Sequence, residues 1–203
     1  MRPALLARLT TLALVALAAA APAATSAEPA RPLALLPESK LWLEGDSTLH
    51  PYHANATRWT LTASMAPRPG NQPVLTELEA IIPVMGLKSG DGALDANMYK
   101  AFKAEDHPAI HFLMASSQVR VSGTDAVSAD LTGALEVAGV EKPTTLHAEG
   151  RLDDGVFRVS GRKTLSMKAF GVEPPVLLLG AIRVADAIVI RYELAIKRPA
   201  GKP

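Results

Sequence analysis

The chain has 203 residues, of which 21 are basic and 20 acidic, and it contains no cysteine. The lack of cysteine excludes disulfides, thiol catalysis and cysteine-ligated metals, so the fold depends on burial and hydrogen bonding. The formal net charge of +1 and the nine aromatic residues argue against a nucleic-acid partner, which favours a basic face and stacking side chains.

The first 27 residues have the pattern of a secretory signal peptide. Arg2 and Arg8 give a positive start, and the apolar run 12–24 is followed by small residues up to Ala27. The run is shorter than the roughly 20 residues of a membrane-spanning helix, which favours cleavage over an uncleaved anchor. We therefore expect a periplasmic or secreted protein with no membrane span after signal cleavage.

Residues 39–198 are expected to form one domain, preceded by a proline-rich linker or arm at 28–38. Apolar and polar residues alternate through most of this domain, which is typical of strands with one buried face. In the last strand, Asp186 interrupts the apolar face, and this predicts a turn or bulge near Ala185 and Asp186. The predicted strands lie near 40–48, 53–65, 73–84, 108–121, 126–138, 143–153, 156–167 and 181–198.

Two segments lack this alternation. Residues 93–104 carry Leu94, Met98 and Phe102 at a spacing of four, which predicts a short amphipathic helix. Residues 168–180 form a predicted loop that ends in the apolar run 176–179.

Eight strands and one helix, without helices between successive strands, predict an all-β fold and argue against a parallel sheet. We expect a single eight-stranded antiparallel β-barrel with one short helix at about 93–104, with a sandwich as the alternative. An eight-stranded barrel has room to hold one small ligand.

One alternating set of side chains is expected to face the barrel interior. The set includes small residues, among them Ala63, Ala148, Gly133, Gly150 and Gly161. Two interpretations stay open: a cavity that a ligand fills, or a packed core in which small residues complement large ones. The residues predicted to line the interior are Trp59, Leu61, Met65, Ile110, Phe112, Met114, Leu131, Leu135, Val137, Leu146, Phe157, Val159, Ile188, Ile190, Tyr192 and Leu194.

Four stretches resemble the YceI-like family of small periplasmic or secreted proteins with a lipocalin-like barrel. They are 45–50 (GDSTLH), 85–89 with 107–112 (MGLKS and HPAIHF), 131–143 (LTGALEVAGVEKP) and 167–172 (MKAFGV). The third, similar to the family's G-L-x-x-x-G-V-x-K-P segment, is the most specific. The resemblance covers about 40–197 and implies a non-enzymatic protein that binds a long isoprenoid or fatty-acyl molecule in the barrel lumen. It also implies a homodimer, because family members often pair.

No catalytic residue, metal site or cofactor is predicted. His50 and His53 lie three apart, so on a strand they face opposite sides, and no G-x-S-x-G or phosphate-binding loop is present. Arg58, His50, Asn55 and Lys163 are candidates to fix a ligand head group. Two other functions stay open: a structural or stress-response interaction module with a packed barrel, and an enzyme that acts on a lipid.

The helix and the apolar loop each allow two roles. The helix 93–104 is expected to plug the barrel or to act as a mobile lid over it. The run 176–179 is expected to close the barrel end, or else to guard a ligand entrance or contact a membrane or a partner.

Overall fold

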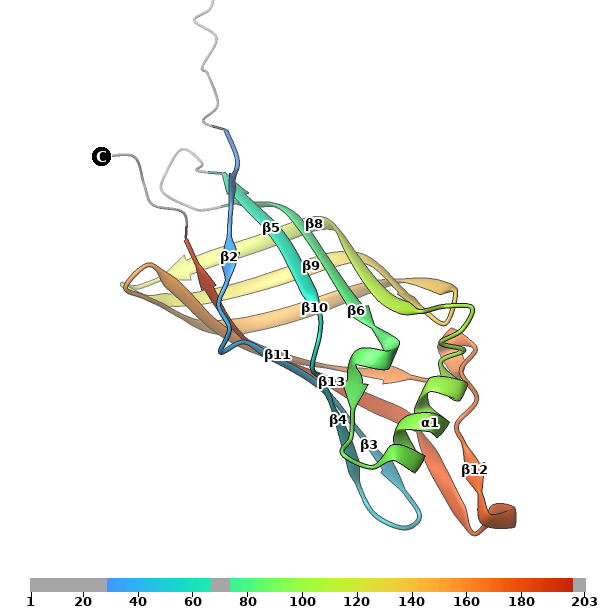
Figure 1. Ribbon diagram of the computed structural model, residues 1–203. Helices are drawn as coiled ribbons and strands as arrows, with labels where there is room; N and C mark the ends of the chain where they lie inside the picture. The colour runs from blue at the N-terminus through green and yellow to red at the C-terminus, as the bar shows by residue number, and fades with distance from the viewer. Residues whose placement is uncertain (1–28, 67–73, 199–203) are drawn as a thin grey trace, which may run out of the picture.

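The structure is a computed structural model that describes residues 29–66 and 74–198. It confirms the all-β, barrel-like fold: one antiparallel sheet curls on itself, and a single α-helix, α1 (Gly92–Ala101), lies at one end (Figure 1). The predicted signal peptide, residues 1–27, lies outside the described residues. Within the described ranges, no helix is both long enough and apolar enough to cross a membrane.

Nine strands of at least five residues carry the sheet in the described part of the chain. They are β3 (Lys40–Ser47), β4 (Tyr52–Ala56), β5 (Thr60–Ala66), β6 (Val74–Pro83), β8 (Ala109–Ser122), β9 (Ala126–Val137), β10 (Val140–Asp153), β11 (Val156–Ser166) and β13 (Ile182–Lys197). Four two-residue strands and three short 3-10 helices join them. These are β1 (Arg31–Pro32), β2 (Ala34–Leu35), β7 (Leu87–Lys88), β12 (Val176–Leu177), η1 (Val84–Gly86), η2 (Lys168–Phe170) and η3 (Leu178–Gly180).

The predicted count of eight long strands was wrong by one, because the predicted strand 53–65 is two strands. The break falls at Thr57, whose backbone N–H and hydroxyl both donate to the carbonyl of Gly86. These bonds pull the chain out of the sheet between β4 and β5. The two-residue strands were missed because they are too short to show a periodicity.

The long strands pair in the order β5-β6-β8-β9-β10-β11-β13-β3-β4. Two short pairings bridge the gap beside the edge strands β5 and β4. At one end, β4 pairs with β7, which follows β6 through η1. At the other end, the arm 31–36 pairs with β5 through β1 and with β13 through β2 (Figure 1). The barrel is therefore closed by patches at its ends and not by a ladder between two full strands.

One turn follows from the local sequence, and the irregularity predicted near Asp186 is confirmed. Asp154 and Gly155, with φ of +45° and +74°, form the two-residue turn between β10 and β11, as expected for Asp-Gly in a hairpin. The pairing of β13 with β3 shifts register between Val184 and Ile188. Within this bulge, the Asp186 carboxylate accepts hydrogen bonds from the Ser166 hydroxyl (2.6 Å) and the Lys168 backbone N–H (2.8 Å).

Helix α1 begins one residue before the predicted start at residue 93 and ends earlier than predicted. Asp91 caps its N-terminus, because its carboxylate accepts from the backbone N–H groups of Ala93 and Leu94. The helix ends at Ala101 and not at residue 104, since Lys103 has a φ of +53°. Met98 and Phe102 are buried against the barrel, so the helix covers this end of the sheet.

Candidate functional site

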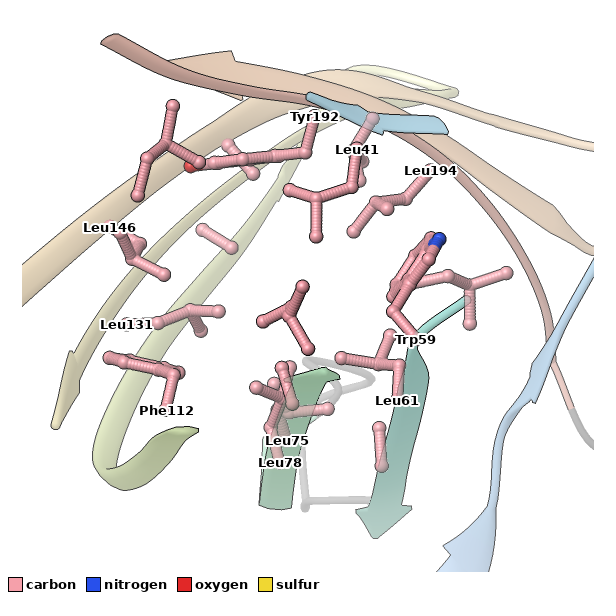
Figure 2. Close-up of a pocket in the computed structure, with 18 of the residues that line it drawn as sticks. Leu41, Trp59, Leu61, Leu75, Leu78, Phe112, Leu131, Leu146, Tyr192 and Leu194 are labelled. Atoms are coloured by element: carbon pink, nitrogen blue, oxygen red, sulfur yellow. The ribbon is translucent and has the colours of Figure 1, made fainter. Parts of the chain in front are cut away.

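An apolar cavity of about 190 Å³ lies inside the curled sheet. Its wall exposes only apolar atoms. Figure 2 shows Trp59, Leu61, Phe112, Leu131 and Leu194 pointing toward a common space from strands on opposite sides of the barrel. The cavity is somewhat larger than the cavities of about 150 Å³ that stay dry and take up benzene-sized molecules. The interior is therefore not a fully packed core.

The wall of the cavity is elongated. Along β9 alone it runs from Val127 to Leu135, and eight steps of about 3.3 Å give a length on the order of 26 Å. A wall of this length offers apolar contacts along an extended chain.

Most residues predicted to face the interior line this cavity. They are Trp59, Leu61, Met65, Ile110, Phe112, Leu131, Leu135, Leu146, Phe157, Val159, Ile190, Tyr192 and Leu194. Whether these side chains contact a ligand stays a prediction.

Three residues of the predicted set lie elsewhere. Val137 and Ile188 line a separate space of about 40 Å³ beside Phe102. Met114 packs against the core without lining the cavity. The reason is a bulge, because the pairing of β8 with β9 shifts register between Met114 and Ser116.

Two further strands and the arm contribute to the wall, and none of them was predicted to do so. On β3 the alternation of Leu41 and Leu43 was visible in the sequence and should have identified that strand as part of the wall. On β6 the wall residues Leu75 and Leu78 do not alternate, because a register shift against β5 lies between them. Leu33, in the proline-rich arm, also lines the cavity and carries no periodic signal.

The small inward residues fall into two groups. Ala63 and Ala148 line the cavity, as the open-space interpretation expects. That interpretation was wrong for Gly133, Gly150 and Gly161, since a Cβ at each would collide with the backbone of the neighbouring strand. These glycines let adjacent strands approach closely where the sheet coils, and they leave no room for a ligand.

Tyr192 brings a hydroxyl to this apolar wall. Its ring packs on Gly161, and its hydroxyl donates to the backbone carbonyl of His147 at 2.7 Å. Burial raises the pKa of Tyr192 to about 12, so the hydroxyl stays neutral and keeps its proton for this bond. The one polar atom of the side chain is thereby satisfied by the strand and turned away from the cavity.

None of the four head-group candidates reaches the cavity. Arg58 and His50 are exposed, and Lys163 is half-buried outside the cavity wall. Asn55 lines a groove on the outer face of β3 and β4 together with His53. Within the described ranges, there is no group of three or more His, Asp or Glu side chains that could hold a metal ion.

The strongest cluster of charged groups lies on the outer face of β9 and β10. His147 contacts the Asp130 carboxylate through Nδ1 (2.6 Å) and the Glu149 carboxylate through Nε2 (2.9 Å). The hydrogen bonds to Glu149 and Asp130 raise the pKa of His147. Asp130 also accepts a hydrogen bond from Arg120 (3.1 Å), and the cluster faces away from the cavity.

Helix α1 fills the end of the barrel opposite the arm. Met98 and Phe102 pack against Leu43 and Ile188, and together they leave a space of about 40 Å³. Of the two roles considered for the helix, this packing fits a plug. The prediction that 176–179 closes the barrel end was wrong for most of the run, because only Leu177 turns inward while its neighbours are exposed.

Comparison with known proteins supports the family resemblance. A family model described as a YceI-like domain matches residues 44–196. No curated protein sequence matches the chain.

Several solved structures resemble this one. BcnA of Burkholderia cenocepacia has a TM-score of 0.61 and 17% identity, covering 77% of this chain and 95% of that one. A polyisoprenoid binding domain from Saccharophagus degradans, implicated in plant cell wall breakdown, has a TM-score of 0.58 and 13% identity, covering 82% and 98%. The YceI protein of Campylobacter jejuni has a TM-score of 0.54 and 19% identity, covering 72% and 85%. At such identities these structures establish the fold alone.

Proposed function

Because the chain belongs to the YceI-like family, we propose that it is a non-enzymatic binding protein that holds one long apolar molecule inside the barrel. The ligand is of the isoprenoid or fatty-acyl type. The observation that carries this proposal is the long cavity of about 190 Å³ with a wholly apolar wall. The related Saccharophagus degradans domain is named for binding polyisoprenoids, which are ligands of the same class.

Apolar burial supplies the affinity. A chain that loses a few hundred Å² of apolar surface to the cavity gains on the order of 5–10 kcal/mol at about 25 cal/mol/Å². Part of this gain is offset by the lost freedom of the ligand. Since no charged side chain lines the cavity, selection acts on the width and length of the chain, and a polar head group would stay outside the wall.

We place this activity in the periplasm or outside the cell. The support is the signal-peptide pattern of residues 1–27, with its positive start, apolar run and small-residue site. A homodimer, which the family resemblance implies, stays a prediction that analytical ultracentrifugation decides.

A pair of substitutions on β9 tests the binding site. Ala129→Leu adds carbon atoms at a position that lines the cavity, whereas Ala134→Leu adds the same atoms on the opposite face of the strand. Both alanines are half-buried, so the two variants are matched in exposure. A long-chain polyprenol and palmitate serve as probes, with tryptophan fluorescence as the readout, because both tryptophans of the chain, Trp42 and Trp59, line the cavity.

We expect Ala129→Leu to weaken binding at least tenfold, equal to about 1.4 kcal/mol, and Ala134→Leu to bind like the unaltered protein. Equal binding by both variants would show that the ligand does not occupy the cavity. If the unaltered protein binds neither probe, the proposal that the barrel holds an isoprenoid or fatty-acyl chain is contradicted.

A further inference from the structure

Four apolar side chains stand exposed at the end of the barrel covered by α1. They are Leu49 (64% exposed), Val176 (62%), Leu178 (73%) and Leu179 (110%), and we call them the apolar tip. Leu49 belongs to the loop between β3 and β4, and the other three to β12 and η3. In Figure 1 both loops reach the same end of the molecule, away from the C-terminal end of β13.

The two loops of the apolar tip are tied together by hydrogen bonds. The backbone N–H of Thr48 donates to the carbonyl of Arg183 (3.0 Å), and the N–H of Arg183 donates to the Thr48 hydroxyl (3.1 Å). The same hydroxyl donates to the carbonyl of Ala181 (3.2 Å). Leu49 is thus held beside η3, and the tip is one built surface.

The backbone of η3 is unfavourable for the residues it carries. Leu178 and Leu179 have φ of +49° and +54°, a region that leucine avoids because its Cβ approaches the following carbonyl oxygen. Packing within the protein does not explain this conformation, since both side chains are largely in solvent. Strained, exposed leucines of this kind point to a contact outside the chain.

The size and charge of the apolar tip match a lipid bilayer. Four aliphatic side chains expose on the order of 400 Å² of apolar surface, about half of the roughly 800 Å² that each partner buries in a stable protein interface. On the loop of β12 and η3, the one charged residue between Glu173 and Asp186 in the sequence is Arg183, and on the other loop the exposed Asp46 precedes Leu49. Arg183 is exposed and donates from Nε to the carbonyl of Gly180, which places a cation directly behind the leucines.

We propose that the apolar tip inserts into the surface of a lipid bilayer, with its leucines among the acyl chains and Arg183 at the level of anionic head groups. Amphipathic surfaces with apolar side chains on one side and basic ones behind them bind membranes in this way. The purpose of the contact rests on the proposed function, because a carrier of an apolar chain must exchange it with a membrane.

Leu43 lies between the tip and the cavity. Leu177, the residue of the run that turns inward, lines the space of about 40 Å³ under α1 together with Leu43 and Ile188. Leu43 also lines the main cavity, so one buried side chain separates the two spaces.

Vesicle sedimentation tests the contact. The protein is mixed with vesicles of phosphatidylcholine, with and without phosphatidylglycerol, and the pelleted fraction is measured. Leu178→Ser with Leu179→Ser is the test variant, and Leu113→Ser is the control, since Leu113 is exposed to 57% on β8. Thermal unfolding of each variant shows that the fold is retained.

We expect the unaltered protein to pellet with vesicles, more strongly when phosphatidylglycerol is present. The double variant should lose affinity by about a hundredfold, as for two leucines withdrawn from an apolar phase, and the control should not change. Full retention of binding by the double variant, equal loss in the control, or no binding by the unaltered protein would overturn the inference. So would a dimer that the double substitution dissociates, because the tip would then be a protein interface.

Binding of the polyprenol in detergent solution, measured on the same variants, separates this inference from the proposed function. The double variant should bind the polyprenol like the unaltered protein, because the substituted leucines lie outside the cavity wall. Vesicle binding without polyprenol binding would retain the membrane contact and reject the carrier role. The converse would retain the carrier role and reject the membrane contact.

Discussion

Gly150→Ala should destabilise the fold although it adds a single methyl group. Gly150 pairs with Val159 on β11, and a Cβ at this position would collide with the carbonyl oxygen of Arg158 and with the Cα of Val159. These are backbone atoms of a central strand, so they cannot rotate away, and β10 and β11 would have to separate locally. Overpacking of this kind costs about 1–3 kcal/mol. In a domain of this size, each kcal/mol lowers the melting temperature by roughly 2–4 °C.

Thermal denaturation followed by circular dichroism measures the effect of Gly150→Ala. Gly92→Ala is the matched control, because a Cβ at Gly92 meets no atom within 4 Å and the residue begins α1. The control should melt at the temperature of the unaltered protein or slightly above it, as alanine favours a helix over glycine. If Gly150→Ala melts with the control, the strands do not approach as closely as described, and the glycine leaves free space after all.

Three further predictions concern single side chains. Tyr192→Phe should lower the free energy of unfolding by about 1 kcal/mol, because the His147 carbonyl loses its donor. The pKa of Tyr192 in the folded state is raised to about 12 from 10.0, so its contribution to stability is present below pH 10 and lost as the pH rises through 12. The stability of the variant at alkaline pH should therefore fall less steeply than that of the unaltered protein. Glu149 and Asp130 raise the pKa of His147 above 6.5, so the contribution of His147 to folding stability is present below pH 6.5 and lost above the raised pKa. In His147→Gln, the free energy of unfolding measured with urea should therefore change less with pH across this range. Asp91→Ala should cost about 1 kcal/mol through loss of the helix cap and speed amide exchange in the first turn of α1, while unchanged exchange there would contradict the capping role.

The long central strands were the most predictable part of the fold. On β9, one face meets the interior and the other is at least partly exposed, so the period of two is visible in the sequence. Strand β13 follows the same pattern except near its end, where the neighbouring Ala195 and Ile196 are both buried. The Asp186 bulge was predictable for the same reason, since a carboxylate in an apolar series must leave the buried face. Where the strands depart from strict alternation, as between Leu75 and Leu78 on β6, the sequence pattern did not predict the residues that line the wall.

Other features depend on contacts that a one-dimensional pattern does not carry. Arm residue Leu33 becomes part of the wall only because β5 and β13 are brought together by the rest of the sheet. Gly150 and an alanine look alike as small inward residues, yet the coil of the sheet fills the space beside the glycine. The apolar run 176–179 was predicted to close the barrel end because apolar residues are usually buried. Leu178 and Leu179 are exceptions to this rule, because both are exposed.

The most direct test of the central claim is native mass spectrometry of the protein purified from the bacterial envelope, followed by organic extraction. The account predicts a stoichiometric additional mass of a few hundred daltons or more, released into the organic phase as an isoprenoid or fatty-acyl molecule. A protein mass with nothing bound, unchanged after incubation with a lipid extract of the same envelope, would contradict the claim that the cavity holds an apolar chain.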